Sequence, residues 1–140
     1  MDHRNEQVEA FVQALHTASQ REKKPLVRST HFLLPPGDND PIEHNILSWK
    51  AQEFAYRQFS QDREALPTLA RGLFTEKVNG QYERIVIRGY DKFFNQDELA
   101  WTLPNAIATY STGPFILSFK ENGCIIFISA ITPKRLVVTS

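Results

Sequence analysis

The chain has 140 residues, of which 41% are hydrophobic and 23% are charged. This is the composition of a globular protein, and it excludes the disordered and fibrous classes. Sixteen basic residues balance sixteen acidic ones, so the charge that attracts a polyanion such as RNA must come from local clusters or from a missing part of the protein. No run reaches the ~18 apolar residues of a membrane span, and a single cysteine excludes an internal disulfide. We therefore expect an intracellular protein, of the cytoplasm or the nucleus, with no membrane partner.

The first predicted element is an amphipathic helix over residues 6–19. Its apolar side chains recur at the i, i+3, i+4, i+7 spacing of one helix face: Val8, Phe11, Val12 and Leu15. Asn5 is suited to cap its start. Pro25 ends the helical pattern, because proline lacks an amide donor and disfavours helix just before it.

Extended structure is expected next, over residues 26–34. The run Pro35-Pro36-Gly37-Asp38 then predicts an exposed loop that continues to about Pro41. The apolar residues of 46–59 fit neither a period of two nor one of 3.6, and we predict a strand there.

The middle of the chain has the pattern of a β-hairpin. Strand-like runs over 69–75 and 83–88 flank Asn79-Gly80, a strong signal for a hairpin turn. A short helix is expected over 96–103, ended by Pro104. Three further strands are predicted, the last two joined at Thr132-Pro133: 114–119, 124–131 and 134–139. The fold class is α+β, a short helical front followed by mainly antiparallel sheet. The last strand runs to the end of the sequence, which predicts an uncovered edge and a fragment of a larger sheet.

The run Phe119-Lys120-Glu121-Asn122-Gly123 has the chemistry of nucleotidyl transfer. A lysine amine that attacks a nucleotide α-phosphate must lose its proton, and desolvation or nearby cations favour the neutral form. Glycine lets the backbone approach a phosphate or adopt positive φ. A lysine followed by glycine three residues later is common, and a solvated surface hairpin explains it equally well.

Three further cations stand among apolar or aromatic residues: Arg71, Arg88 and Lys92. Arginine there is costly unless it is paired or meets an anion, and it grips phosphate bidentately. All three are candidates to bind one polyphosphate with Lys120. The alternative is that each pairs with a structural carboxylate such as Asp91 or Glu83. The four histidines lack metal-ligand spacing, so no metal site is predicted, and Cys124 is expected to be a small core residue.

Three blocks in order carry a family resemblance: ARGLF (70–74), RGYDKFFN (88–95) and TGPFILSFKENGCIIFIS (112–129). Together they resemble the adenylyltransferase domain of fungal tRNA ligases and, more distantly, the phage RNA ligases. The strong similarity covers residues 66–140, with a weaker one upstream through Ser48-Trp49-Lys50. The resemblance implies the N-terminal part of the nucleotidyltransferase fold, an incomplete domain with a lead over 1–45 and the motif-bearing part over 46–140.

By this resemblance, Lys120 matches the nucleophile that forms lysyl-AMP from ATP, and Gly123 the glycine of the same motif. Arg71 and Lys92 match residues that neutralise ATP phosphates, as does Arg88 by its place before KFFN. Phe119 is a candidate to stack on adenine. ATP and Mg²⁺ are the implied cofactors, with no metal ligand assigned in this chain.

The implied partners are tRNA exon halves, sealed through their RNA ends. The resemblance also implies a missing C-terminal part of the ligase domain, and kinase and cyclic phosphodiesterase domains. We expect the chain alone to be inactive. Two alternatives stay open: a non-catalytic interaction module that uses an exposed sheet edge, and another covalent nucleotidyltransferase.

Overall fold

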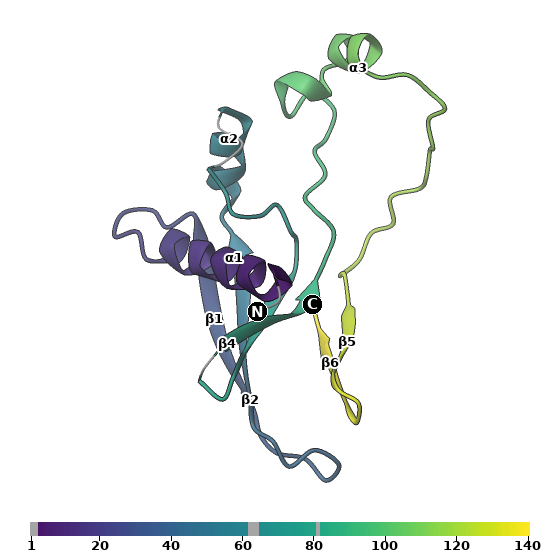
Figure 1. Ribbon diagram of the computed structural model, residues 1–140. Helices are drawn as coiled ribbons and strands as arrows, with labels where there is room; N and C mark the ends of the chain where they lie inside the picture. The colour runs from purple at the N-terminus through teal and green to yellow at the C-terminus, as the bar shows by residue number, and fades with distance from the viewer. Residues whose placement is uncertain (1–2, 62–64, 81) are drawn as a thin grey trace. The chain divides into compact units, whose positions relative to one another are not determined.

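The computed structural model describes residues 3–61, 65–80 and 82–140, and the chain divides into two compact units. Unit 1 comprises Met1–Asp91 and Ile126–Ser140, and unit 2 comprises Lys92–Ile125. Figure 1 shows the elements of both in chain order. No helix in the described ranges has the length and apolar content needed to cross a membrane.

Unit 1 is built on a four-stranded antiparallel sheet in the order β1-β2-β3-β4. Its strands are β1 (Val27–Leu34), β2 (His44–Ala51), β3 (Leu73–Val78) and β4 (Tyr82–Arg88). Asn79 and Gly80 between β3 and β4 have φ of 51° and 70°. β3 and β4 pair antiparallel on either side of these two residues, so the predicted hairpin is confirmed.

The helix α1 (His3–Ser19) covers one face of this sheet and contacts β1 and β4 (Figure 1). Val12, Leu15 and Ala18 of its apolar face are buried, with Leu15 fully so, and Val8 and Phe11 are half-buried. The His16 ring lies edge-on to Trp49 at 4.9 Å, and His16 Nε2 is 2.9 Å from Glu83 Oε1. The Trp49 indole N–H donates to Thr75 Oγ1 at 2.8 Å, which satisfies both buried polar groups.

A two-stranded hairpin, β5 (Phe127–Thr132) and β6 (Arg135–Thr139), packs on the opposite face of the sheet. The two faces are distinguished by strand alternation, because Ile46 and Trp49 of β2 are an odd number of residues apart. Ile46, Phe74, Ile87 and Ile131 form the buried core of this second face. Leu34, Val86, Phe127 and Val137 pack around them.

A buried polar network ties the hairpin to the sheet. His44 Nδ1 is 2.5 Å from Glu76 Oε1, and His44 Nε2 is 2.9 Å from Asp40 Oδ2. Each ring nitrogen of His44 therefore lies within hydrogen-bond distance of a buried carboxylate. Arg84 donates to Glu76 Oε2 and to the carbonyl of Ile131, both at 2.6 Å. Thr132 Oγ1 donates to Asp40 at 3.2 Å. The network therefore joins the β1–β2 loop to β2, β3, β4 and β5.

Acid is expected to weaken unit 1 through Asp40. The hydrogen bond from His44 is the main cause that holds the pKa of Asp40 below its ordinary value of 3.8. A carboxyl whose pKa is lower in the folded state stabilises the fold above its unfolded pKa, and this contribution is lost as pH falls through the folded pKa. The free energy of unfolding should therefore decrease below about pH 4, measured by urea titration across acidic buffers. In Asp40→Asn this part of the decrease should be absent.

The predicted helix over 6–19 is confirmed, but it begins by His3, so Asn5 lies inside the helix and does not cap it. The predicted extended segment at 26–34 is β1. The strand predicted over 46–59 is wrong beyond Ala51, because helix α2 (Glu53–Gln61) follows. Ala55 and Tyr56 of that helix are buried. The window 46–59 contains both a strand and a helix, joined at Gln52. Their apolar residues follow different periods, so neither a period of two nor one of 3.6 fitted the whole window.

In unit 2 the predicted helix is replaced by two short elements, a 3₁₀ turn (Ala100–Thr102) and α3 (Pro104–Tyr110). Pro104 begins α3 instead of ending a helix, because the first helical turn needs no amide donor. The strand predicted over 114–119 is wrong, and the one over 124–131 begins only at Phe127. Cys124 is exposed, so its prediction as a core residue is also wrong. The α+β class, with a short N-terminal helix and antiparallel sheet, is confirmed.

Candidate active site

Two Arg-Gly dipeptides, Arg71-Gly72 and Arg88-Gly89, lie side by side just before β3 and at the end of β4. The Gly89 N–H donates to the Gly72 carbonyl at 2.6 Å, and the Arg71 N–H donates to the Tyr90 carbonyl at 2.8 Å. Gly72 has φ of +81°, a conformation that favours glycine. A Cβ on Gly89 would lie 1.9 Å from the Arg71 carbonyl oxygen. The glycines therefore permit a backbone approach that side chains would prevent.

The Phe127 ring covers both glycines. A Cβ on Gly72 would lie 2.3 Å from this ring, and one on Gly89 would lie 2.7 Å from it. The chain leaves unit 1 after Asp91 and rejoins it at Ile126. Within unit 1, the two ends of the intervening segment are therefore adjacent, and Arg71 lies beside them.

Substitution of Gly89 is expected to disturb this crossing. Gly89→Ala places a methyl group against the Arg71 backbone, so one segment must shift, at a cost of about 1–3 kcal/mol for such overpacking. Thermal unfolding measures the loss. Gly37→Ala is the matched control, because a Cβ at Gly37 would meet nothing within 4 Å. Equal melting temperatures for the two variants would contradict the role of Gly89.

The Arg71 side chain points to helix α2. Its Nη1 is 3.3 Å from Glu53 Oε1, and its guanidinium carbon lies 5.9 Å from the centre of the Tyr56 ring. Burial raises the pKa of Tyr56, and the positive charge of Arg71 opposes that shift. Glu53 is largely exposed, so this ion pair holds Arg71 only weakly.

Arg88 has a local carboxylate partner. Its Nη2 donates to Asp91 Oδ1 at 2.6 Å, and its Nη1 donates to the Gly89 carbonyl at 3.1 Å. About half of each side chain of the Arg88–Asp91 pair is exposed. Both partners are therefore accessible to solvent and to a competing anion.

In unit 2, Lys92 is held by the residues that follow it. Its Nζ is 3.0 Å from Glu98 Oε1 and 4.9 Å from the centre of the Phe94 ring. The Phe94 ring packs edge-on against Trp101 at 5.9 Å. The backbone N–H of Asn95 donates to Glu98 Oε2 at 2.8 Å, and this bond, with the Lys92 ammonium, lowers the pKa of Glu98. The Lys92 side chain is only 11% exposed, so this cation is the most enclosed of the set.

Lys120 lies in a segment without regular secondary structure and is exposed. Among the described residues it has no ion pair, unlike Arg71, Arg88 and Lys92. Phe119 is 96% exposed, so in this structure its ring is not packed in a core. Gly123 has φ of +147°, and a Cβ there would meet nothing within 4 Å.

The structure brings Arg71 and Arg88 together through their paired backbones in unit 1. Unit 2 carries the others: Lys92, Phe119, Lys120 and Gly123. The carboxylate partners Glu53 and Glu98 were missed by sequence reasoning, and so was the pairing of Gly72 with Gly89. The Arg-Gly dipeptide occurs twice in the sequence, and this repeat was the signal that could have indicated the pairing of Gly72 with Gly89.

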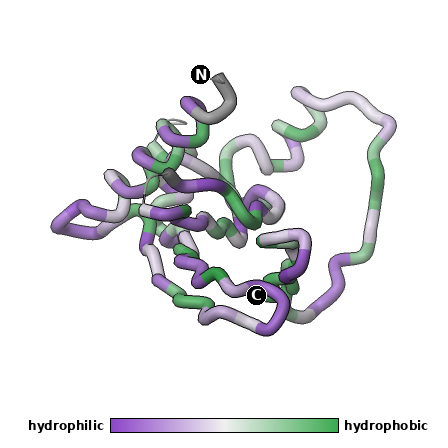
Figure 2. Tube along the Cα trace, turned by 60° about the horizontal axis from the view of Figure 1, so that its bottom comes forward, coloured by the Kyte–Doolittle hydropathy of each residue, from purple (hydrophilic) through white to green (hydrophobic). Residues whose placement is uncertain are grey.

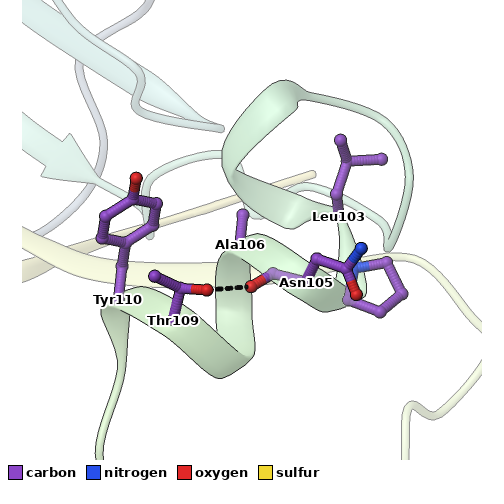
Figure 3. Close-up of a pocket in the computed structure, with 6 residues that line it drawn as sticks. Leu103, Asn105, Ala106, Thr109 and Tyr110 are labelled. Carbon is purple, nitrogen blue, oxygen red and sulfur yellow. Dashed lines mark hydrogen bonds between the residues drawn. The ribbon is translucent and has the colours of Figure 1, made fainter.

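Two other features of the described part bear on the site. No group of three or more His, Cys, Asp or Glu residues there has the arrangement to hold a metal ion. A shallow hollow on α3 is drawn in Figure 3, where Thr109 Oγ1 donates to the Asn105 carbonyl at 2.7 Å. It contains none of the predicted site residues.

Comparison with known proteins identifies the family. The chain matches the RNA ligase family over residues 69–140, just over half of its length. It is 43% identical over 131 residues to tRNA ligase 1 of Schizosaccharomyces pombe, covering 85% of this chain and 16% of the relative. It is 45% identical over 93 residues to a tRNA ligase of Candida albicans, covering 66% and 10%. The chain thus spans less than a fifth of the length of either relative. The resemblance to fungal tRNA ligases is confirmed, and the chain belongs to the RNA ligase family.

Proposed function

We propose that this chain supplies the nucleotide-binding front part of the adenylyltransferase domain of an ATP-dependent tRNA-splicing ligase, with the nucleotidyltransferase fold. The observation that carries the proposal is the family match over residues 69–140, which contains all four candidate cations in order. Residues 1–140 would then form the lead and the motif-bearing part of one incomplete domain.

Lys120 is the proposed nucleophile. Its neutral Nζ attacks the α-phosphorus of ATP, a P–N bond forms, the bond to the β-phosphate breaks, and pyrophosphate leaves. The AMP then passes to the 5′-phosphate of one RNA end and frees Lys120. The hydroxyl of the other end attacks that phosphate, releases AMP and forms the phosphodiester. Lys120 is exposed, so its amine is accessible to ATP, and we propose that the bound nucleotide and the neighbouring cations favour its neutral form.

The other cations are proposed to bind phosphate oxygens in place of their carboxylate partners. Arg71 and Arg88 have half-exposed side chains in weak surface pairs, and guanidinium binds phosphate bidentately. Lys92 would neutralise the departing charge as a point cation. Gly123 leaves the backbone beside Lys120 open, and Phe119 offers a ring for adenine.

Mg²⁺ is proposed to arrive with ATP and to neutralise charge on the phosphates. Because the described residues offer no cluster of metal ligands, the ion would keep phosphate oxygens and water as its ligands here. The attack by Lys120 and the phosphate contacts of Arg71 and Lys92 are made by those side chains and not by the metal ion.

The family match favours this proposal over an interaction module that uses a free sheet edge. Among covalent nucleotidyltransferases, the similarity to two tRNA ligases favours RNA over other substrates. For the whole protein we propose tRNA exon halves as substrates, kinase and cyclic phosphodiesterase domains as companions, and an intracellular location.

A segment exchange tests the proposal. The segment of the S. pombe relative that matches this chain is replaced by residues 1–140, and the purified chimera is incubated with α-³²P-labelled ATP and Mg²⁺. We expect covalent label that survives alkali and is released by acid, as a P–N bond requires, and tryptic mapping should place it on Lys120. An unlabelled chimera beside a labelled parent would overturn the proposal.

A further inference from the structure

A strip of five cations lies where α1 leads into β1 and beside it at the end of β2. We call it the basic strip, and its members are Arg21, Lys23, Lys24, Arg28 and Lys50. All five are exposed. In Figure 2 the loop between α1 and β1 is a mostly hydrophilic projection.

The strip concentrates charge in a chain that has none overall. Residues 21–28 and Lys50 contain five basic residues and one acidic residue, Glu22, so together they carry a formal charge of +4. The rest of the chain must then carry −4, because the whole sums to zero. Such polarisation steers a polyanion to one surface.

Arg28 and Lys50 are directly opposite each other in the β1–β2 register, with their side chains on the same face of the sheet. Like charges in this position are destabilising. Neither side chain has a carboxylate within ion-pair distance among the described residues. The next pair on the same face, Thr30 and Ser48, carries hydroxyl groups that can donate to an anion. Two cations on adjacent strands, with two hydroxyl groups beside them, provide hydrogen-bond donors suited to a phosphate group.

We infer that the basic strip binds the sugar–phosphate backbone of the RNA substrate, independently of the candidate active-site cations. The inference rests on the proposed function for its RNA partner. Cations and hydroxyl groups bind phosphates without reading the bases, so we assign the strip to backbone contact without sequence preference.

The test is fluorescence anisotropy of a labelled RNA hairpin titrated with the full 140-residue chain at several salt concentrations. Arg28→Glu should weaken binding about tenfold and lower the slope of log K against log salt by about 1. Lys134→Glu is the matched control, since it makes the same charge change at an exposed lysine in the β5–β6 turn and should have a much smaller effect. Arg28→Glu also places opposite charges across from each other, so its melting temperature should be unchanged or raised.

Equal losses for Arg28→Glu and Lys134→Glu would overturn the inference, because the effect would then depend on net charge alone. Stronger binding to anionic phospholipid vesicles than to RNA would overturn the RNA assignment. If the chimera forms lysyl-AMP but Arg28→Glu leaves the RNA affinity unchanged, the inference about the basic strip fails and the proposed function stands. If no lysyl-AMP forms but RNA binding depends on the strip, the proposed function fails and the strip remains an RNA contact.

Discussion

Replacing Lys120 with alanine in the segment-exchanged ligase is expected to reduce ATP-dependent RNA sealing by a factor on the order of 10³ or more, the scale of losing a covalent nucleophile. Arginine should fail equally, because its guanidinium stays protonated and offers no free electron pair. The measurement is the rate of joining of 5′-phosphorylated RNA with ATP and Mg²⁺.

The step at which Lys120 acts can be isolated with RNA that already carries AMP on its 5′-phosphate. Sealing of this substrate needs no lysyl-AMP, so Lys120→Ala should retain much of the parent rate with it. Lys134→Ala is the control for loss of an exposed lysine. Retention of ATP-dependent sealing by Lys120→Ala would assign the nucleophile to another residue. Loss of both reactions would show that Lys120 supports the fold or RNA binding instead.

The elements predicted well from sequence were those whose signal is local. The α1 stripe, the β1 segment and the Asn79-Gly80 turn each follow from residues within one window. The errors came where one window held two structures, as at Gln52, or where an apolar run was assumed to find a partner. Ile116 and Leu117 have strand-like sequence, yet they are 94% and 95% exposed and pair with no strand among the described residues. Pairing over long sequence distances is not encoded in a local pattern.

The sequence identified candidate residues for the site, but it did not predict how their side chains are arranged. The proposal that cations pair with structural carboxylates holds in the described structure for Arg71, Arg88 and Lys92, and only the Asp91 partner was named in advance. Glu53 lies 18 residues before Arg71, on a helix where a strand was expected. The buried cluster around His44 was invisible for a related reason, since Asp40 was assigned to an exposed loop.

The largest stability loss is expected for His44→Ala. His44 is 2% exposed, and its two ring nitrogens lie within hydrogen-bond distance of the buried carboxylates of Asp40 and Glu76, so its removal takes a partner from each and leaves an empty site. A buried polar group that loses its hydrogen-bond partner costs about 1–3 kcal/mol, and more when the group is charged. Urea unfolding at neutral pH measures this loss in the free energy of unfolding.

His31→Ala is the matched control, because His31 lies on the neighbouring strand with an exposed hydrogen bond to Asn45, and it should cost less than about 1 kcal/mol. A second variant separates charge from packing. Adding Glu76→Gln to His44→Ala removes the charge of one of the two carboxylates that lose their contact with His44, so the double variant should be less destabilised than the sum of the single ones. Simple additivity would contradict an electrostatic origin and indicate that His44 acts only by filling space. Arg84 links Glu76 to the Ile131 carbonyl of β5. The loss of the His44 side chain should therefore also weaken the packing of the β5–β6 hairpin on the sheet, and residues 92–125 lead into this hairpin.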